Sequence, residues 1–286
     1  KGNQNGIFGY GENPSAGTLT NLVSSVGVVA TDVAGVGTAR KELAACEYGG
    51  DKGIFGFGNT SPARVGMTNL VSNAGVVATD VSAVGTARSV LAACSFGGDK
   101  GIFGFGNTGS ETAITNLVSN AGVVASDTAG VGTTRNLPSA CEYGGDKGIF
   151  GFGQDGGTSV SMTNLVTNVG VVGTDTTGVG TARQKQGACD YGFDKGIFAY
   201  GEDPSGLLSM SNLVSNVGVV AADVTGVGTA RQSPAACEYG GDKGIFGYGE
   251  YPLKSMTNLV SNTGVVATDT VGVGSARASL AACSYN

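Results

Sequence analysis

Six cysteines recur along this 286-residue chain at nearly constant intervals. They lie at Cys46, Cys94, Cys141, Cys189, Cys237 and Cys283. An even number of cysteines suits a disulfide framework, but a bridge needs Cα atoms within about 7 Å of each other. Equivalent positions of a repeat are expected to lie further apart than that. We therefore expect buried free thiols that pack as small apolar side chains, with a metal-binding or redox role as the alternative.

The chain contains no histidine. This excludes Ser-His-Asp and Cys-His catalysis and every His-ligated metal site. An enzyme would have to use Asp, Glu, Tyr or Arg, and no part of the chain has a carboxylate pair that stands out from the rest. We expect no enzymatic activity, no cofactor and no bound metal.

Aspartate and arginine recur together, each aspartate eight positions before an arginine. The pairs are Asp32 and Arg40, Asp80 and Arg88, Asp127 and Arg135, Asp175 and Arg183, Asp223 and Arg231, and Asp269 and Arg277. A ring of carboxylates could bind calcium, and Asp with Arg could act in catalysis. However, an active site usually breaks a repeat, and this pair is uniform. We expect a structural role, in which each aspartate caps a loop or pairs with an arginine.

An aromatic residue also occupies one equivalent position throughout the chain. These residues are Tyr10, Phe57, Phe105, Phe152, Tyr200 and Tyr248. Exposed rings would form sugar-stacking platforms, whereas buried rings would pack neighbouring units together. We favour packing, because the sheets expected here are covered on both faces.

Two short segments of each unit differ from unit to unit. One follows the aromatic residue, as at 59–66, and the other follows the arginine, as at 89–90. In an up-and-down sheet both segments emerge on one face, and loops on a rigid scaffold commonly bind partners. Neutral drift predicts the same variation. The candidate binding residues in these loops are Glu12, Asn13, Arg64, Glu111, Asp155, Asp203, Tyr251 and Lys254.

Composition limits the partners. The net charge is −6, and no run of lysine and arginine is present. Binding to a phosphate backbone needs a basic surface, so we expect no nucleic-acid partner. No apolar run approaches the roughly 20 residues of a membrane span, so we expect no membrane insertion. No targeting signal is visible.

These residues belong to one unit of about 48 residues that occurs six times. The isoleucine of the Ile-Phe-Gly tract marks the units, at Ile7, Ile54, Ile102, Ile149, Ile197 and Ile245. Short apolar segments bounded by glycine predict four strands in each unit. In the second unit these are 52–58, 67–72 and 75–79, followed by 90–96. The strands equivalent to 52–58 begin near 5, 52, 100, 147, 195 and 243.

Four short strands in a repeat of this length predict an all-β fold, a six-bladed β-propeller with four-stranded antiparallel blades that spans residues 1–286 as a single domain. The chain begins in a strand equivalent to 52–58 and ends in a strand equivalent to 90–96. Within a blade, the second of these precedes the first. The C-terminal strand can therefore complete the first blade and close the ring. A β-solenoid is the main alternative.

The order of features in each unit resembles the kelch repeat. An arginine is followed by a strand of small residues, a glycine turn and a strand that ends in glycine, as in Arg88, Cys94, Gly98 and Gly104. A tryptophan typical of kelch is replaced by Val76-Val77. The tracts Ile-Phe-Gly-Tyr-Gly and Thr-Asn-Leu-Val-Ser-Asn are also similar to repeats of tail or surface proteins from viruses of aquatic microbes. These resemblances imply a non-enzymatic binding or structural protein at a virion or cell surface, with a glycan or a protein as partner. A multivalent lectin with one site per blade is the alternative, and an enzyme on a propeller scaffold is the second.

Overall fold

The structure is a computed structural model that describes residues 3–82 and 84–286. These residues form 22 strands in eight small antiparallel sheets and contain no helix. Since no helix is present among them, none is long and apolar enough to cross a membrane. The all-β prediction is confirmed.

Six of the sheets have three strands each, and every one is built from the same three tracts of the repeat. The inner strands carry the cysteines: β3 (Ala44–Tyr48), β6 (Ala92–Phe96), β9 (Ser139–Tyr143), β14 (Gly187–Tyr191), β19 (Ala235–Tyr239) and β22 (Ala281–Tyr285). The middle strands are β1 (Asn5–Gly9), β4 (Lys52–Gly56), β7 (Lys100–Gly104), β10 (Lys147–Gly151), β15 (Lys195–Ala199) and β20 (Lys243–Gly247). The outer strands are β2 (Thr20–Val23), β5 (Thr68–Val71), β8 (Thr115–Val118), β13 (Thr163–Val166), β18 (Ser211–Val214) and β21 (Thr257–Val260). The middle strands begin where the repeat spacing predicts.

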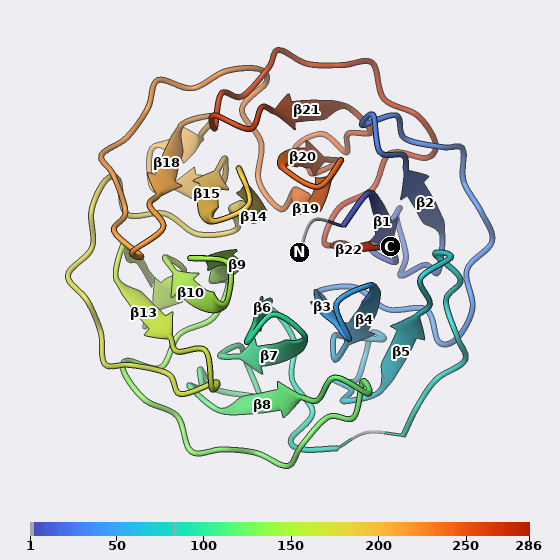
Figure 1. The fold of residues 1–286 in the computed structure, drawn as a ribbon, viewed down its shortest axis with the longest axis horizontal. Coiled ribbons are helices and arrows are strands. Elements are labelled where there is room, and N and C mark those ends of the chain that lie inside the picture. Colours follow the sequence, from blue (N-terminus) through green and yellow to red (C-terminus); the bar gives the residue numbers. More distant parts are fainter. Residues whose placement is uncertain (1–2, 83) are drawn as a thin grey trace.

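The six sheets surround one axis (Figure 1). Each inner strand contacts the inner strands of both neighbouring sheets, and the series returns from β22 to β3. The C-terminal strand β22 pairs with β1 from Asn5↔Tyr285 to Gly9↔Ala281. The first sheet is therefore assembled from both ends of the chain, as the order of its tracts predicts.

The fourth strand of each unit is absent as a continuous ladder. In the second unit the segment expected at 75–79 joins β5 only through the isolated bridges Val71↔Val77 and Thr68↔Val81. Between the bridges, Asn69 Nδ2 donates hydrogen bonds to the carbonyl of Ala78 and to Asp80 Oδ1. The Asn69 side chain thus donates to a carbonyl that would accept a hydrogen bond from a backbone N–H in a regular β-ladder. The six sheets around the axis are three-stranded, and the expectation of four regular strands in each was wrong.

The apolar core lies between neighbouring sheets. Cys46 and Ile54 of one sheet pack in the same cluster as Phe103 of the next. Glycines permit this close approach, because a Cβ at Gly101 would lie 2.5 Å from Cys46 Sγ. Each sheet is thereby covered on both sides, which explains why its strands are apolar on both faces.

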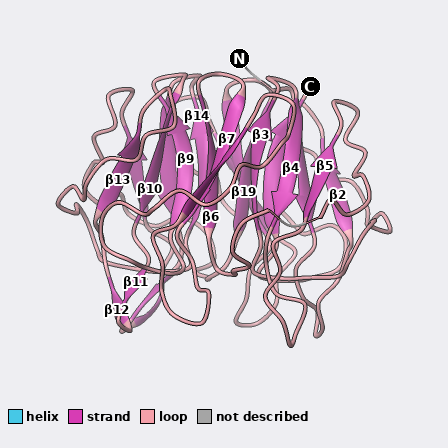
Figure 2. Ribbon diagram, turned by 90° about the horizontal axis from the view of Figure 1, so that it is seen from below, coloured by secondary structure: helices cyan, strands magenta, loops and turns pink. Residues whose placement is uncertain are grey.

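Two small hairpins extend from one end of the ring, as Figure 2 shows for β11 (Gln154–Asp155) and β12 (Thr158–Ser159). The second is β16 (Glu202–Asp203) with β17 (Gly206–Leu207). We call this end the variable face, because it carries the loops that differ between units. The opposite end carries the uniform glycine turns, and we call it the turn face.

Candidate functional site

The repeated arginines join neighbouring sheets. The Arg40 side chain is fully buried. Its Nε donates to the carbonyl of Phe57 at 2.9 Å, and its Nη2 donates to Asn69 Oδ1 at 2.7 Å, both in the second unit. The guanidinium lies 4.3 Å from the ring centroid of Tyr10 in the first unit. Arg40 thus links two sheets by hydrogen bonds on one side and a cation–π contact on the other.

The repeated aspartates complete the same junction. Asp80 accepts hydrogen bonds from the backbone N and Oγ1 of Thr38 and from Asn69 Nδ2, and it lies 3.9 Å from Arg40 Nη1. Burial alone would raise the pKa of Asp80, but these hydrogen bonds and the Arg40 charge outweigh it and hold the pKa below 3.8. The aspartate therefore faces the arginine of the preceding unit rather than the one eight positions later.

The other units repeat this arrangement. Thr86, Thr133, Thr181, Thr229 and Ser275 each donate to the corresponding aspartate, namely Asp127, Asp175, Asp223, Asp269 and Asp32. The arginine Nε donates to the carbonyl of the following aromatic residue at every junction. These contacts use the carboxylates within the scaffold, so the geometry is that of a structural joint.

The six repeated aromatic rings are fully buried. Tyr10 meets Phe55 of the next sheet edge to face, with centroids 5.2 Å apart, and Phe57 meets Phe103 in the same way at 5.1 Å. A sugar can stack only on an exposed ring face. The sugar-platform hypothesis is wrong for these positions. Each ring packs between sheets instead, with an arginine over its face, as Arg40 lies over Tyr10, and a phenylalanine of the next sheet in edge-to-face contact.

The six cysteines are free and buried, as predicted. Burial raises the pKa of Cys141, Cys189, Cys237 and Cys283, which disfavours the reactive thiolate. The sulfur atoms pack on glycines of the neighbouring sheet, as Cys283 does on Gly53.

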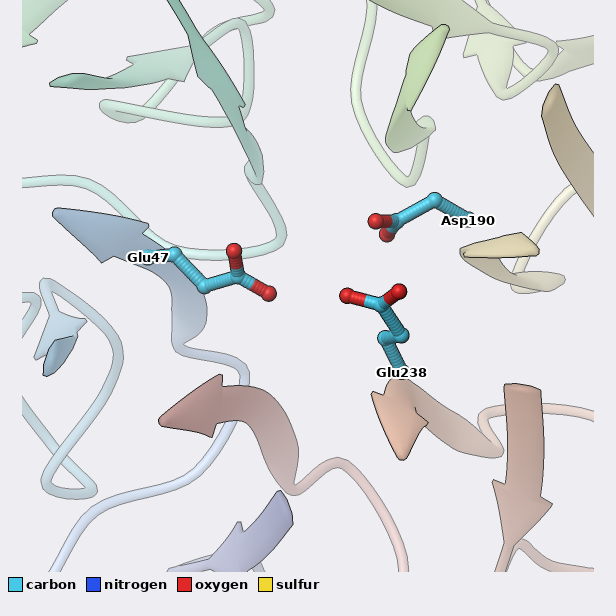
Figure 3. A group of neighbouring side chains, drawn as sticks. All are labelled: Glu47, Asp190 and Glu238. Carbon is cyan, nitrogen blue, oxygen red and sulfur yellow. The ribbon is translucent and has the colours of Figure 1, made fainter. Parts of the chain in front are cut away.

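Acidic side chains meet where the inner strands approach the turn face. Carboxylate oxygens of Glu47, Asp190 and Glu238 lie within 4.8 Å of one another (Figure 3). Carboxylates are the ligands that hard cations prefer, so these are the side chains that could hold a metal ion. Beside them, Ser95 Oγ donates to Glu142 Oε2 at 2.7 Å. The sequence reasoning missed this group, although a polar residue follows every cysteine in an otherwise apolar strand.

The two variable segments share one face, which confirms the prediction. The residue after each arginine bridges the loop of the following unit, as in Lys41↔Asn59, Asn136↔Gln154 and Gln184↔Glu202. These bridges bring the two segments together at the variable face.

The eight candidate binding residues lie on six loops of this face, with Glu12 and Asn13 on one loop and Tyr251 and Lys254 on another. Glu12 forms an ion pair with Lys41. Asn13 and Arg64 are exposed, as is Tyr251, and Lys254 is half-buried. Asp203 accepts hydrogen bonds from the backbone N of Ser205 and Gly206 within its own hairpin.

One pair of neighbouring loops is brought together. Glu111 accepts hydrogen bonds from Asn136 Nδ2 at 3.1 Å and from the backbone N of Gly156 at 2.9 Å. Gly156 follows Asp155 in the next hairpin, so Glu111 and Asp155 lie on adjoining loops. The remaining candidates do not converge on a single pocket among the described residues.

The loops also surround an axial cavity. It has a volume of about 150 Å³, and its lining includes Glu42, Val90, Leu137, Lys185, Ser233 and Ser279, the second residue after each arginine. A smaller cavity of about 40 Å³ continues along the axis toward the carboxylate group. Alanines of the inner strands line both cavities.

No protein-family model matches the chain, and no curated protein matches its sequence.

Proposed function

We propose that this chain is a six-bladed β-propeller of kelch-like blade order that works as a non-enzymatic binding module. The cyclic contacts of the inner strands and the pairing of β22 with β1 support this interpretation of the fold. Each blade then comprises a three-stranded sheet and an outer segment attached by isolated bridges.

The observation that carries the functional proposal is the separation of uniform and variable residues. The repeated arginines, aspartates and aromatic residues occur in all six units, and their contacts join neighbouring sheets. The segments that differ meet on the variable face. A rigid ring that presents different loops on one face suits recognition of a partner by several loops at once.

Contacts between loops prepare this face for binding. Lys41 pairs with Glu12, Lys185 pairs with Glu202, and Gln232 Nε2 donates to Glu250 Oε1 at 3.1 Å. Each contact joins a segment after an arginine to a loop beside it. Loops that are already ordered lose less conformational entropy on association, which favours affinity.

The partner that we propose is a glycan or a protein at a virion or cell surface. The net charge of −6 argues against nucleic acid. Exposed Asn13 and Arg64, with Tyr251 on another loop, offer the amide, guanidinium and aromatic groups that polar surfaces of either kind accept.

The test is binding of the labelled protein to a glycan array and to intact microbial cells. A variant in which the loop 107–111 replaces the equivalent loop of every other unit removes the differences but keeps a native loop. Phe193→Gly is the matched control, since Phe193 lies in a glycine turn of the opposite face. Binding that is lost in the loop variant alone supports the proposal. Binding retained by both variants overturns it in favour of a lectin site at repeated positions, and absence of binding by all three proteins overturns it altogether.

A further inference from the structure

Six residues form a ring at the mouth of the axial cavity. They are Glu42, Val90, Leu137, Lys185, Ser233 and Ser279, and we call them the axial ring. The backbone N of Val90 donates to the carbonyl of Glu42 at 2.9 Å, and Leu137 N donates to the Val90 carbonyl at 2.9 Å. Three further links of this kind join Ser279 to Glu42, Leu137 to Lys185, and Lys185 to Ser233. The backbone of the ring is thereby held around the axis.

All six ring residues adopt left-handed backbone conformations, with φ between 51° and 58°. This region favours glycine, and a β-branched residue such as Val90 is especially disfavoured there. The six buried aromatic residues, such as Tyr10 and Phe57, share this conformation, with φ between 60° and 66°. The axial ring thus carries the same kind of backbone conformation as these structural positions, and it keeps side chains rather than glycine at the mouth of the cavity.

The ring side chains differ around the axis. Because the sheets follow one another in chain order, Val90 and Leu137 are neighbours and form an apolar arc. Ser233 and Ser279 are neighbours on the other side, where Ser233 Oγ donates to Glu250 Oε1 at 2.9 Å. We call this pair the serine arc. Between the arcs, Glu42 and Lys185 are three places apart in the six-membered ring and therefore stand opposite each other.

The charged ring residues retain hydrogen-bonding capacity. Lys185 Nζ contacts Glu202 Oε1 at 2.9 Å and Gln232 Oε1 at 3.4 Å, and an ammonium has three donors. Glu42 Oε2 has a long contact of 3.5 Å with Asn59 Nδ2, and a carboxylate accepts at several positions. Both residues also line the cavity.

From this geometry we infer that the axial cavity binds a small aliphatic zwitterion, an amino acid of the size of leucine. A cavity of about 150 Å³ is large enough for a group of six carbon atoms, since an apolar protein cavity of that volume holds benzene. The aliphatic group lies on the alanines of the inner strands and against Val90 and Leu137. The carboxylate of the ligand faces Lys185, and its ammonium faces Glu42. This site does not depend on the proposed surface partner.

The test uses methyl NMR of protein labelled at valine and leucine, titrated with L-leucine. Its two analogues are 4-methylpentanoate, which lacks the ammonium, and 3-methylbutylamine, which lacks the carboxylate. We expect leucine to shift the Val90 and Leu137 methyl signals, and each analogue to bind about tenfold more weakly, since a charged hydrogen bond contributes that much.

Variants assign the two charges. Glu42→Gln is expected to weaken leucine about tenfold and to leave 4-methylpentanoate unchanged, whereas Lys185→Gln weakens leucine similarly and leaves 3-methylbutylamine unchanged. Ala93→Leu fills the floor of the cavity and abolishes binding, and Ala74→Leu in an exposed turn is its matched control. Unshifted Val90 and Leu137 signals at millimolar leucine would overturn the inference. Equal affinity for leucine and both analogues would also overturn it, as would binding that survives Ala93→Leu.

Discussion

Ser275 donates hydrogen bonds from its backbone N and its Oγ to the Asp32 carboxylate, at 2.9 and 2.7 Å, although 243 positions separate the two residues. The equivalent contact between Thr38 and Asp80 spans only 42 positions. The first and last units are thus joined in the same way as consecutive units. Together with the pairing of β1 and β22, this contact gives the closing junction the same construction as the others.

The first prediction concerns this closing junction. Asp32→Ala removes hydrogen bonds from Ser275 and Asn21 and leaves Arg277 without its carboxylate at 3.6 Å. We expect the free energy of unfolding to fall by about 2 kcal/mol, because hydrogen bonds to charged groups contribute about that much. Ser275→Ala should cost about 1 kcal/mol. Urea denaturation measures both values.

The double variant distinguishes a shared contact from two independent effects. If Ser275 acts through Asp32, the double variant is about as stable as Asp32→Ala alone. A sum of the two single effects would contradict this assignment. Asp80→Ala is the matched control at an internal junction, and it should cost as much as Asp32→Ala.

The second prediction concerns acid. Hydrogen bonds and arginine charges outweigh burial and hold the pKa of each junction aspartate below the ordinary value of 3.8. A carboxyl with a depressed pKa stabilises the fold above its unfolded pKa, and this stability is lost as the pH falls through the folded pKa. Stability should therefore be nearly constant from neutral pH to about pH 5 and then fall steeply below 3.8.

A pH series of urea unfolding curves measures this dependence. Asp80→Asn removes one of the titrating groups, so its stability should depend less on pH below 3.8 than that of the parent protein. An acid dependence identical to that of the parent would show that Asp80 does not contribute.

Much of the fold was predictable because its signals are local. The Lys-Gly-Ile-Phe-Gly tract specifies the middle strand wherever it occurs, and glycine turns separate it from its neighbours. The predicted strands extended too far, by two residues at one end in these two cases. Phe57 has a φ of 62°, which ends β4 at Gly56, and Val90 has a φ of 51°, which delays the start of β6 to Ala92. Neither residue type signals a left-handed conformation.

The parts of the site that were missed depend on closure of the ring. Glu47, Asp190 and Glu238 come from three separate units and meet only because their strands surround one axis. The outer segment failed as a strand because Asn69 competes for the carbonyl of Ala78. A contact from side chain to backbone of this kind leaves no periodic pattern in the sequence.

The third prediction concerns thiol reactivity. The six cysteines are buried, and thiol reagents attack the thiolate, which burial disfavours. We expect the native protein to react negligibly with an aromatic disulfide reagent, and all six thiols to react in urea. Asn73→Cys adds an exposed thiol as a control and should give one fast equivalent. Fast reaction of the parent protein would contradict the burial of its cysteines.

Phe193 departs from the glycine turns of the other units. It has a φ of 68°, whereas Gly50, Gly98, Gly145 and Gly241 occupy the equivalent position with φ of 75° to 78°. Its side chain is 62% exposed. Phe193 thus carries the strain of a left-handed residue without burying its ring.

The last prediction follows from this strain. A left-handed conformation costs a residue with a side chain about 1–2 kcal/mol, and glycine is largely free of that cost. Glycine also makes the unfolded chain more flexible, which offsets part of the gain in folding free energy. We expect Phe193→Gly to raise the free energy of unfolding by about 0.5–1 kcal/mol in urea denaturation. Gly145→Phe is the reciprocal control, since a Cβ there meets only the Phe193 carbonyl oxygen at 4.0 Å, and it should be destabilising to a similar extent. A loss of stability in Phe193→Gly would show that the exposed ring makes a stabilising contact that outweighs the backbone strain.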